Sequence, residues 1–347
     1  MSEIRQDPIT GRYVIIAEGR SARPDEYRGP PPGETPPGCP FCAGHESTTP
    51  LEVAAYRPSG SPANGPGWSV RTIPNKFPTV TPDPTPLTVD VAAGEVRRAG
   101  FGLHEVVIES PAHFPAMPEM PTGQMREVVR MIRERVRAVA AHPGIGAVVT
   151  FENTGPESGG SLSHPHAQIV ALAEIPPLLV EESQGLGRFS RTHGGVCAWE
   201  AELARERSGG SRVVWDTPEL VAYTPFASSH PYEVRFLPAR HAPSLGHATD
   251  AELDRLAVML PGVLRALLSV VPGASYNFVA NSYANGRPEE KAHHWHLDLL
   301  PRLVRPDGFD VGGGIPVNIV APERAASELK AALGSAVPST APSPSVP

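Results

Sequence analysis

The chain has 347 residues, a formal net charge of -7 at pH 7 and 40% hydrophobic residues, which suits a globular protein of about two domains. The acidic balance argues against a general nucleic-acid-binding protein, which normally has a basic surface, but it allows an anionic small ligand held by local cations. No apolar run reaches the roughly 20 residues of a membrane helix, and the N-terminal sequence MSEIRQDPITGRYVII lacks a secretory signal pattern. We therefore expect a cytoplasmic protein that binds neither nucleic acid nor a membrane.

The first half of the chain alternates between strand and helix patterns. Segments 11–18, 68–78 and 104–110 are rich in β-formers with alternating polarity, and we expect strands there. Segment 123–144 has apolar residues at helical spacing and ends in His-Pro-Gly, so a helix is predicted. Segment 147–155 then predicts a strand that leads into a glycine- and serine-rich loop at 155–163.

The second half repeats this order. A helix is predicted over 249–271, with a capping box from Thr249 to Glu252 and a kink at Pro261. Strands follow at 275–282 and at 293–301, the latter with His294, His296 and Asp298 at alternate positions. We interpret this as an internal duplication with domains at 1–185 and 186–334, followed by a proline-rich tail at 335–347 that we expect to be disordered.

A polar row in the first half is the first candidate site. In a strand, His164, His166 and Gln168 all point to one face. An imidazole is a good nucleophile toward phosphorus near neutral pH, and Gln168 can donate a hydrogen bond to a phosphoryl oxygen without acting as a strong acid, which favours transfer over hydrolysis. Backbone N–H groups of the 155–163 loop can approach phosphates closely, and Ser161 could donate to a leaving phosphate. The alternative is that the histidines decorate a strand and the loop is only a turn.

The cysteines indicate a second candidate site. Cys39 and Cys42 form a C-x2-C pair, which is half of a common zinc site or a redox pair. The third cysteine, Cys197, stands far away without a second C-x2-C. Two further zinc ligands would therefore be histidines, and His45 is a local candidate. Two ordinary cysteines without a metal are the alternative.

Several motifs taken together resemble the galactose-1-phosphate uridylyltransferase family of the histidine-triad superfamily. They are DPITGRYVIIAEGRSARP at 7–24, CPFC at 39–42, IPNKFP at 73–78, FEN at 151–153, Gly-Gly-Ser at 159–161 and HPHAQ at 164–168. The resemblance covers roughly residues 6–325. It implies an α+β fold of two tandem histidine-triad-like domains, each an antiparallel sheet with packed helices.

The resemblance also implies roles for individual residues. His166 matches the nucleophile that accepts a nucleoside monophosphate, and Gln168 and Ser161 match residues that contact the transferred and leaving phosphates. His113 and His164 complete a four-ligand structural zinc site with Cys39 and Cys42, in preference to His45. The remaining matched positions are nucleotide and phosphate contacts at Arg20, Arg23, Asn75, Lys76, Asn153 and Gly159, and sugar contacts at Asp310 and Asn318.

The activity that the resemblance implies is double displacement through a uridylyl-histidine, with UDP-glucose as donor, a hexose 1-phosphate as acceptor and a homodimer as the working unit. The C-terminal segment 308–323 looks more like the branch with ADP-glucose phosphorylases, where inorganic phosphate is the acceptor. This is the leading alternative. A non-catalytic nucleotide-binding module and a dinucleotide hydrolase are further alternatives, and Gln168 in place of a proton-shuttling histidine argues against the hydrolase.

Relatives often hold a second metal in the C-terminal half, and here its ligands are not evident from the sequence. Glu200 stands where a second cysteine is expected after Cys197. The other candidates are Glu181, Glu182, Glu219, His294 and His296. A second metal in the C-terminal domain is therefore one expectation, and a second histidine row kept as an ancestral remnant is the other.

Overall fold

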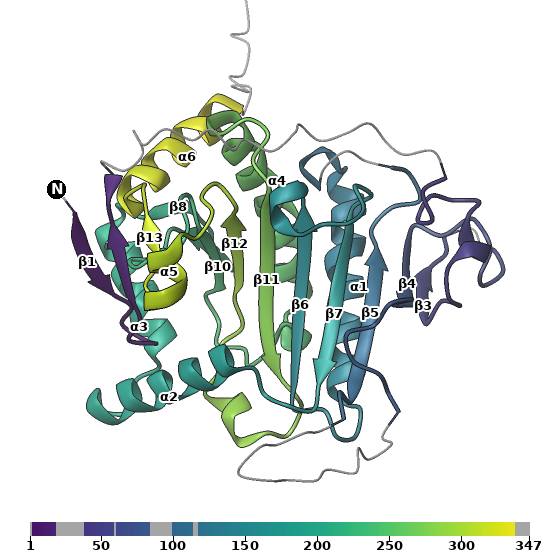
Figure 1. Cartoon of the computed structure of the whole chain (residues 1–347), viewed down its shortest axis with the longest axis horizontal. Coiled ribbons are helices and arrows are strands. Elements are labelled where there is room, and N and C mark those ends of the chain that lie inside the picture. Colours follow the sequence, from purple (N-terminus) through teal and green to yellow (C-terminus); the bar gives the residue numbers. More distant parts are fainter. Residues whose placement is uncertain (1, 19–37, 59, 84–98, 114–116, 337–347) are drawn as a thin grey trace, which may run out of the picture.

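The structure is a computed structural model that describes residues 2–18, 38–58, 60–83, 99–113 and 117–336. Within these ranges, ten strands form one large sheet in the order β3-β4-β5-β7-β6-β11-β12-β10-β9-β8 (Figure 1). The first half of the chain supplies β3 (Ala54–Tyr56), β4 (Val70–Pro74), β5 (Gly102–Ile108), β6 (Ala147–Thr154) and β7 (His166–Leu172). The second half supplies β8 (Val213–Asp216), β9 (Leu220–Tyr223), β10 (Val234–Pro238), β11 (Tyr276–Tyr283) and β12 (Leu297–Pro301).

The two halves of the sheet mirror each other about the central antiparallel pair β6 and β11. Outward from this pair the order is β7, β5, β4 and β3 on one side and β12, β10, β9 and β8 on the other. The predicted α+β fold with tandem antiparallel sheets is confirmed, and the two sheets are joined edge to edge into one. The predicted boundary after residue 185 stays a prediction, and it falls inside helix α2 (Pro177–Thr192).

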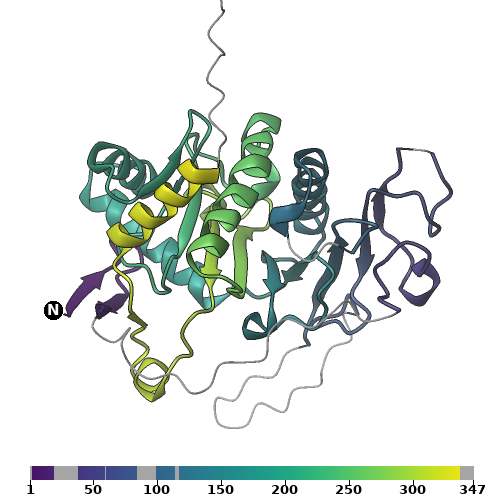
Figure 2. The same ribbon diagram turned by 90° about the horizontal axis from the view of Figure 1, so that it is seen from above.

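Helices α1 (Thr122–Ala140) and α4 (Asp250–Val270) lie side by side on one face of the large sheet (Figure 2). Their apolar sides, together with alternate residues of the strands, form the main hydrophobic core. α4 starts at the predicted capping box, in which the Thr249 side chain accepts the Glu252 N–H. The helix runs without interruption through Pro261, so the kink predicted there does not end it.

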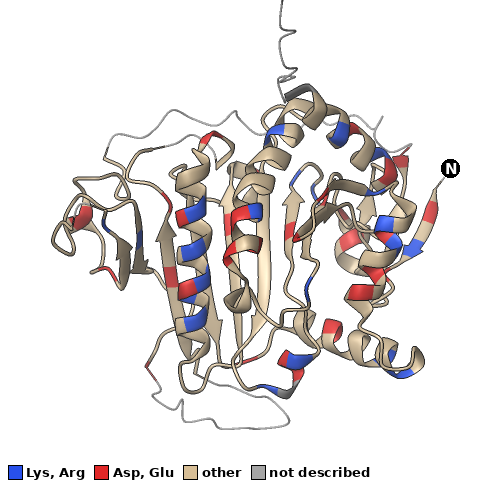
Figure 3. Cartoon of the chain, turned by 180° about the vertical axis from the view of Figure 1, so that it is seen from behind, with Lys and Arg blue, Asp and Glu red and all other residues tan. Residues whose placement is uncertain are grey.

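Charged residues of both signs recur along the helices of this layer (Figure 3). Arg130 is 3.1 Å from Asp254, and Arg133 is 2.6 Å from Asp250, so ion pairs connect α1 with α4 across the two halves. Asp250 is exposed, so solvent screens its pair with Arg133. Arg130 and Asp254 are partly exposed, so their pair contributes less than about 1 kcal/mol. Burial of the apolar faces, and not these ion pairs, holds the helices to the sheet.

The N-terminal strands β1 (Glu3–Gln6) and β2 (Tyr13–Ile16) form a small three-stranded sheet with β13 (Val317–Asn318), which runs parallel to β2. The remaining helices are α3 (Ala198–Gly209), α5 (Gly308–Gly313) and α6 (Pro322–Ala336). Because α6 continues to Ala336, the predicted start of the tail at residue 335 was two residues too early, and residues 337–347 lie outside the described part. No helix within the described ranges has both the length and the apolar content to cross a bilayer.

Candidate active site and metal centre

A row of polar side chains crosses the face of the large sheet opposite α1 and α4. Along β7, Ala167, Ile169 and Ala171 belong to the core beneath α1, so His166 and Gln168 point to the other face. The strands beside β7 add polar residues to this face, which are His104 on β5, Asn153 on β6 and, from the second half, Asn277 on β11, paired with Asn153. The predicted nucleophile therefore lies within a polar surface that strands of both halves build.

His166 has the geometry of a neutral imidazole nucleophile. Its Nδ1 donates to the backbone oxygen of His164 at 2.7 Å, so Nε2 keeps its lone pair. Burial lowers the pKa of His166, while this hydrogen bond acts in the opposite direction. The ring of Phe41, from the CPFC motif, contacts the imidazole edgewise at 5.2 Å between centroids. His166 is therefore held in one orientation and is uncharged at neutral pH.

The amide of Gln168 lies in a small hydrogen-bonded group. Its Oε1 is 3.0 Å from Nε2 of His104 and 3.4 Å from Nδ2 of Asn75. Asn75 was predicted to hold the nucleoside, and the structure places its side chain against Gln168. His104 was not found from the sequence, because only the register of β5 against β7 brings it to this position.

The glycine-rich loop is fastened by the second half of the chain. Nδ2 of Asn277 donates to Oδ1 of Asn153 at 2.7 Å and to the carbonyl oxygen of Ser158 at 3.0 Å. Gly159 adopts a left-handed conformation with φ of 83°, which glycine tolerates without strain. A Cβ at Gly160 would lie 2.9 Å from the Asn153 carbonyl oxygen. The loop is therefore shaped for close packing against Asn153, and Ser161 at its end is exposed.

The structure places the remaining predicted phosphate and sugar contacts in different surroundings. Arg20 and Arg23 lie outside the described residues, and Lys76 is exposed. Both carboxylate oxygens of Asp310 accept backbone N–H groups, from Asp307 and Val317. Asn318 is fully buried and its amide donates to the carbonyl oxygens of Ser228 and His230, and its contact with a sugar stays a prediction.

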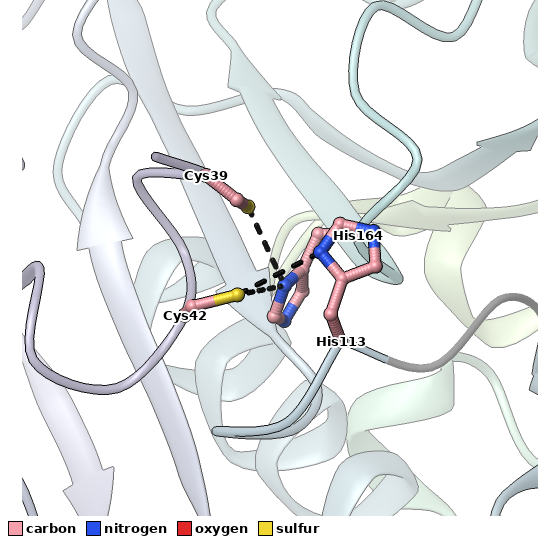
Figure 4. Close-up of side chains that lie close together, drawn as sticks. All are labelled: Cys39, Cys42, His113 and His164. Carbon is pink, nitrogen blue, oxygen red and sulfur yellow. Dashed lines mark hydrogen bonds between the residues drawn. The ribbon is translucent and has the colours of Figure 1, made fainter. Parts of the chain in front are cut away.

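The predicted metal centre is assembled in the structure (Figure 4). Cys39, Cys42, His113 and His164 bring one ligand atom each to within 4.8 Å of one another. The Sγ of Cys39 is 3.6 Å from Nδ1 of His164, and the Sγ of Cys42 is 3.6 Å from Nδ1 of His113. Zn–S bonds of about 2.3 Å and Zn–N bonds of about 2.0–2.1 Å at a tetrahedral angle place sulfur and nitrogen about 3.6 Å apart. The cluster therefore has the dimensions of a four-ligand zinc site.

The histidine tautomer agrees with metal binding. Nε2 of His164 is 2.8 Å from the backbone oxygen of Ser110, so it carries the proton and Nδ1 directs its lone pair at the thiols. Burial lowers the pKa of His164 to about 4, which keeps the ring neutral. His45 points elsewhere, with Nδ1 2.6 Å from the Cys39 carbonyl oxygen, and it is not part of the cluster.

The metal centre and the nucleophile share structural parts. His164 belongs to the candidate metal cluster, and its carbonyl oxygen accepts the hydrogen bond that Nδ1 of His166 donates. Phe41, between the two cysteine ligands, packs against His166. Anything that fixes Cys39, Cys42 and His164 therefore also fixes the imidazole of His166.

The described part of the second half contains two further clusters of possible metal ligands, which the sequence alone did not identify. One consists of Cys197, His241 and His294, and the other of Glu182, His293 and His296. His241 and His293 were missed because neither stands at a recognisable ligand spacing. Three of the predicted candidates lie outside both clusters, since Glu181 pairs with Arg12 and Glu219 with Arg255, while Glu200 is exposed.

His296 is the structural counterpart of His166. Its Nδ1 also lies within hydrogen-bond distance of the backbone oxygen two residues earlier, that of His294, at 3.1 Å. The position that matches Gln168 is Asp298, which is 2.7 Å from Arg235. A carboxylate paired with an arginine offers no free donor to a phosphate and repels its charge. Among the described residues, the side-chain set better suited to a phosphoryl group is therefore the one at His166 and Gln168.

Comparison with known proteins agrees with this geometry. A family model described as galactose-1-phosphate uridyl transferase, N-terminal domain, matches residues 2–176. ADP-glucose phosphorylase of Arabidopsis thaliana is 28% identical over 334 residues, which cover 94% of this chain and 92% of the relative. Galactose-1-phosphate uridylyltransferase of Thermotoga maritima is 27% identical over 346 residues, covering 95% and 98%.

Solved structures with a similar fold include the same two kinds of enzyme. An ADP-glucose phosphorylase from Arabidopsis thaliana with bound ADP-glucose has a TM-score of 0.80 at 26% identity, covering 95% of this chain and 99% of that one. A uridylyltransferase structure has a TM-score of 0.73 at 29% identity, covering 96% and 99%. With a family model that matches residues 2–176 of the 347 and similarity along nearly the whole length of its relatives, the chain belongs to the galactose-1-phosphate uridyl transferase family.

Proposed function

We propose that this protein is a nucleotidyltransferase that moves a nucleoside monophosphate from a nucleotide sugar to Nε2 of His166 and then to a second phosphate group. The observation that carries the proposal is the buried, neutral imidazole of His166, whose Nδ1 is bound to a backbone oxygen at 2.7 Å and whose Nε2 has no hydrogen-bond partner among the described residues. The amide of Gln168 beside it supplies a donor for the phosphoryl group. The family membership of the chain supports the same reaction class.

The bond changes balance in two steps. Nε2 of His166 attacks the α-phosphorus, the bond between that phosphorus and the bridging oxygen breaks, and a sugar 1-phosphate leaves with the electron pair. A phosphate oxygen of the acceptor then attacks the same phosphorus and releases neutral His166. Gln168, Ser161 and the arginines Arg20 and Arg23 would stabilise the negative charge that develops on the oxygens.

The pocket for the nucleotide is proposed to include Asn153, Gly159, Asn75 and Lys76, as the motifs predicted. Asn153 lies beside the loop that carries Gly159, and Asn75 lies beside Gln168. We expect a homodimer whose partner subunit adds groups to the sugar end of the pocket.

The acceptor has two candidates. The motifs predict a hexose 1-phosphate with UDP-glucose as donor. Inorganic phosphate with ADP-glucose as donor is the second candidate. It is supported by the likeness of segment 308–323 to that branch and by 28% identity to an ADP-glucose phosphorylase over 94% of this chain.

A zinc ion at Cys39, Cys42, His113 and His164 would be structural, because four protein ligands leave no open position. Its contribution is to hold the strand start that carries His166. The second metal stays a prediction, and Cys197, His241 and His294 are the donor set that suits zinc, since a thiolate and two imidazoles are its preferred ligands.

The test uses nucleotide sugars labelled on the α-phosphate. The wild-type protein should acquire acid-labile, base-stable label from UDP-glucose or ADP-glucose, and H166A should acquire none. Release of the label by hexose 1-phosphate alone identifies the transferase, and release by phosphate alone identifies the phosphorylase. H296A is the matched control, because His296 has the same hydrogen bond in the second half. Equal labelling of H166A and wild type would contradict the proposal.

A further inference from the structure

His104 lies on β5, beside the two residues that the proposed mechanism uses. Its Nδ1 is 3.0 Å from the backbone nitrogen of Thr79, and its Nε2 is 3.0 Å from Oε1 of Gln168. A backbone N–H can only donate, so Nδ1 of His104 must accept. A neutral imidazole then carries its proton on Nε2, which donates to Gln168.

The neighbouring Asn75 is oriented in the same way. The backbone N–H of Phe77 donates to Oδ1 of Asn75 at 2.8 Å, so the amide nitrogen of Asn75 faces the interior of the group. This nitrogen is 3.0 Å from Nε2 of His104 and 3.4 Å from Oε1 of Gln168. Donation from Asn75 to His104 would need the proton on Nδ1, which the Thr79 N–H excludes, so both donors converge on Gln168.

Two backbone N–H groups therefore determine which end of the Gln168 amide faces outward. The oxygen is engaged by His104 and Asn75, and no residue in the described part of the chain accepts from the NH2 group, which is therefore left for a ligand. A rotated amide would present its carbonyl oxygen to the oxygens of a phosphate, where the two repel each other and a stabilising donor is lost. Burial lowers the pKa of His104, which agrees with the neutral tautomer.

We propose that His104 is a positioning residue that holds the Gln168 amide with its NH2 group toward the transferred phosphate, next to Nε2 of His166. The inference rests on the proposed function for its catalytic consequence, whereas the tautomer and the orientation follow from the hydrogen bonds alone. If this is correct, the Nε2–H group of His104 affects the rate of His166 labelling only by orienting Gln168.

Two substitutions of similar length separate the donor from the bulk of the side chain. H104Q keeps an N–H donor near the position of Nε2, and H104L removes it. The rate of His166 labelling in a single turnover should fall at least tenfold in H104L, below the roughly 100- to 1,000-fold loss seen when a transition-state donor is deleted outright. H104Q should restore the rate to within about threefold of wild type.

A double-mutant cycle distinguishes positioning from a structural role. With Gln168 replaced in Q168A, the H104L substitution should cause no further loss of rate. An equal loss in both backgrounds, or no loss in H104L alone, would overturn the inference.

An independent readout does not need activity. In protein with 15N-labelled histidine, the signals of His104, assigned by their absence in H104L, should show a protonated Nε2 and an accepting Nδ1 at pH 7. The opposite tautomer would overturn the inference even in an active enzyme. Wild-type protein that shows the expected tautomer but forms no labelled intermediate would instead contradict the proposed function.

Discussion

A buried pair of carboxyl groups lies beneath the candidate site and gives the chain a pH-dependent stability. Glu109 directly follows β5, and Glu152 lies on β6 next to Asn153 but on the opposite face. Their exposed fractions are 0% and 1%, and apart from the bond from the Thr154 hydroxyl to Glu152, at 2.9 Å, their oxygens have no other side-chain donor in the described chain. The two carboxyl groups therefore have to share at least one proton.

The free energy of unfolding of the E109Q variant, relative to that of wild type, should increase as the pH rises. Burial, followed by the charge of Glu152, raises the pKa of Glu109 well above the ordinary value. The folded chain thus keeps a proton that the unfolded chain releases above its carboxyl pKa of about 4.3. A raised pKa gives stability that is complete below the unfolded pKa and is lost as the pH rises toward the folded pKa.

The magnitude follows from linkage. One retained proton lowers the free energy of unfolding by about 1.4 kcal/mol for each pH unit. Glutamine has no such proton to lose, so the stability of E109Q relative to wild type should rise by about 3 kcal/mol between pH 5 and pH 7 while Glu109 stays protonated.

Urea unfolding at pH 5, 6 and 7, in buffers with equal zinc, measures this difference. E157Q is the control, because the hydrogen-bonded ion pair with Arg305 lowers the pKa of the partly exposed Glu157, and its stability relative to wild type should stay flat over this range. A flat difference for E109Q as well would refute the reasoning and show that Glu109 is ionised in the folded protein.

Two further predictions concern the metal centre and the packing of α2. C42S should lose one zinc per chain by metal analysis and lower the melting temperature, whereas H45A should keep its zinc, and zinc loss in H45A would reassign the ligand. In α2, a Cβ at Gly185 would lie 1.8 Å from the backbone oxygen of Ile9, so G185A should lower the free energy of unfolding by about 1–3 kcal/mol or more. At Gly187 the nearest atom is the flexible end of Arg191 at 3.3 Å, so G187A should be neutral or stabilising, and equal urea midpoints for both variants would contradict the packing.

The sequence contained enough information for the order of the main elements and for the metal ligands. Helical spacing located α1 and α4, and alternation located β4, β5, β6, β7, β11 and β12, because each element buries one side. The strands β3, β8, β9 and β10 of the same sheet were not predicted. The C-x2-C spacing and the family motifs identified Cys39, Cys42, His113 and His164, which the structure brings together. These features depend on short stretches of chain.

The features that were missed depend on strand register. His104 reaches Gln168 because β5 pairs with β7, and Asn277 reaches the glycine-rich loop because β11 pairs with β6. No local pattern encodes such a pairing between distant strands. The joining of the two sheets into one has the same origin, and so do the clusters at His241 and His293.

The central claim is a covalent bond between phosphorus and Nε2 of His166, and mass spectrometry of the trapped intermediate tests it directly. The wild-type protein, mixed with ADP-glucose or UDP-glucose and kept at alkaline pH, should gain the mass of one nucleotidyl group, which is a nucleoside monophosphate less one water. Fragmentation of the peptide that contains His164, His166 and Gln168 should place this mass on His166. A modified His164 or His296, or an unmodified protein that still consumes the nucleotide sugar, would contradict the account.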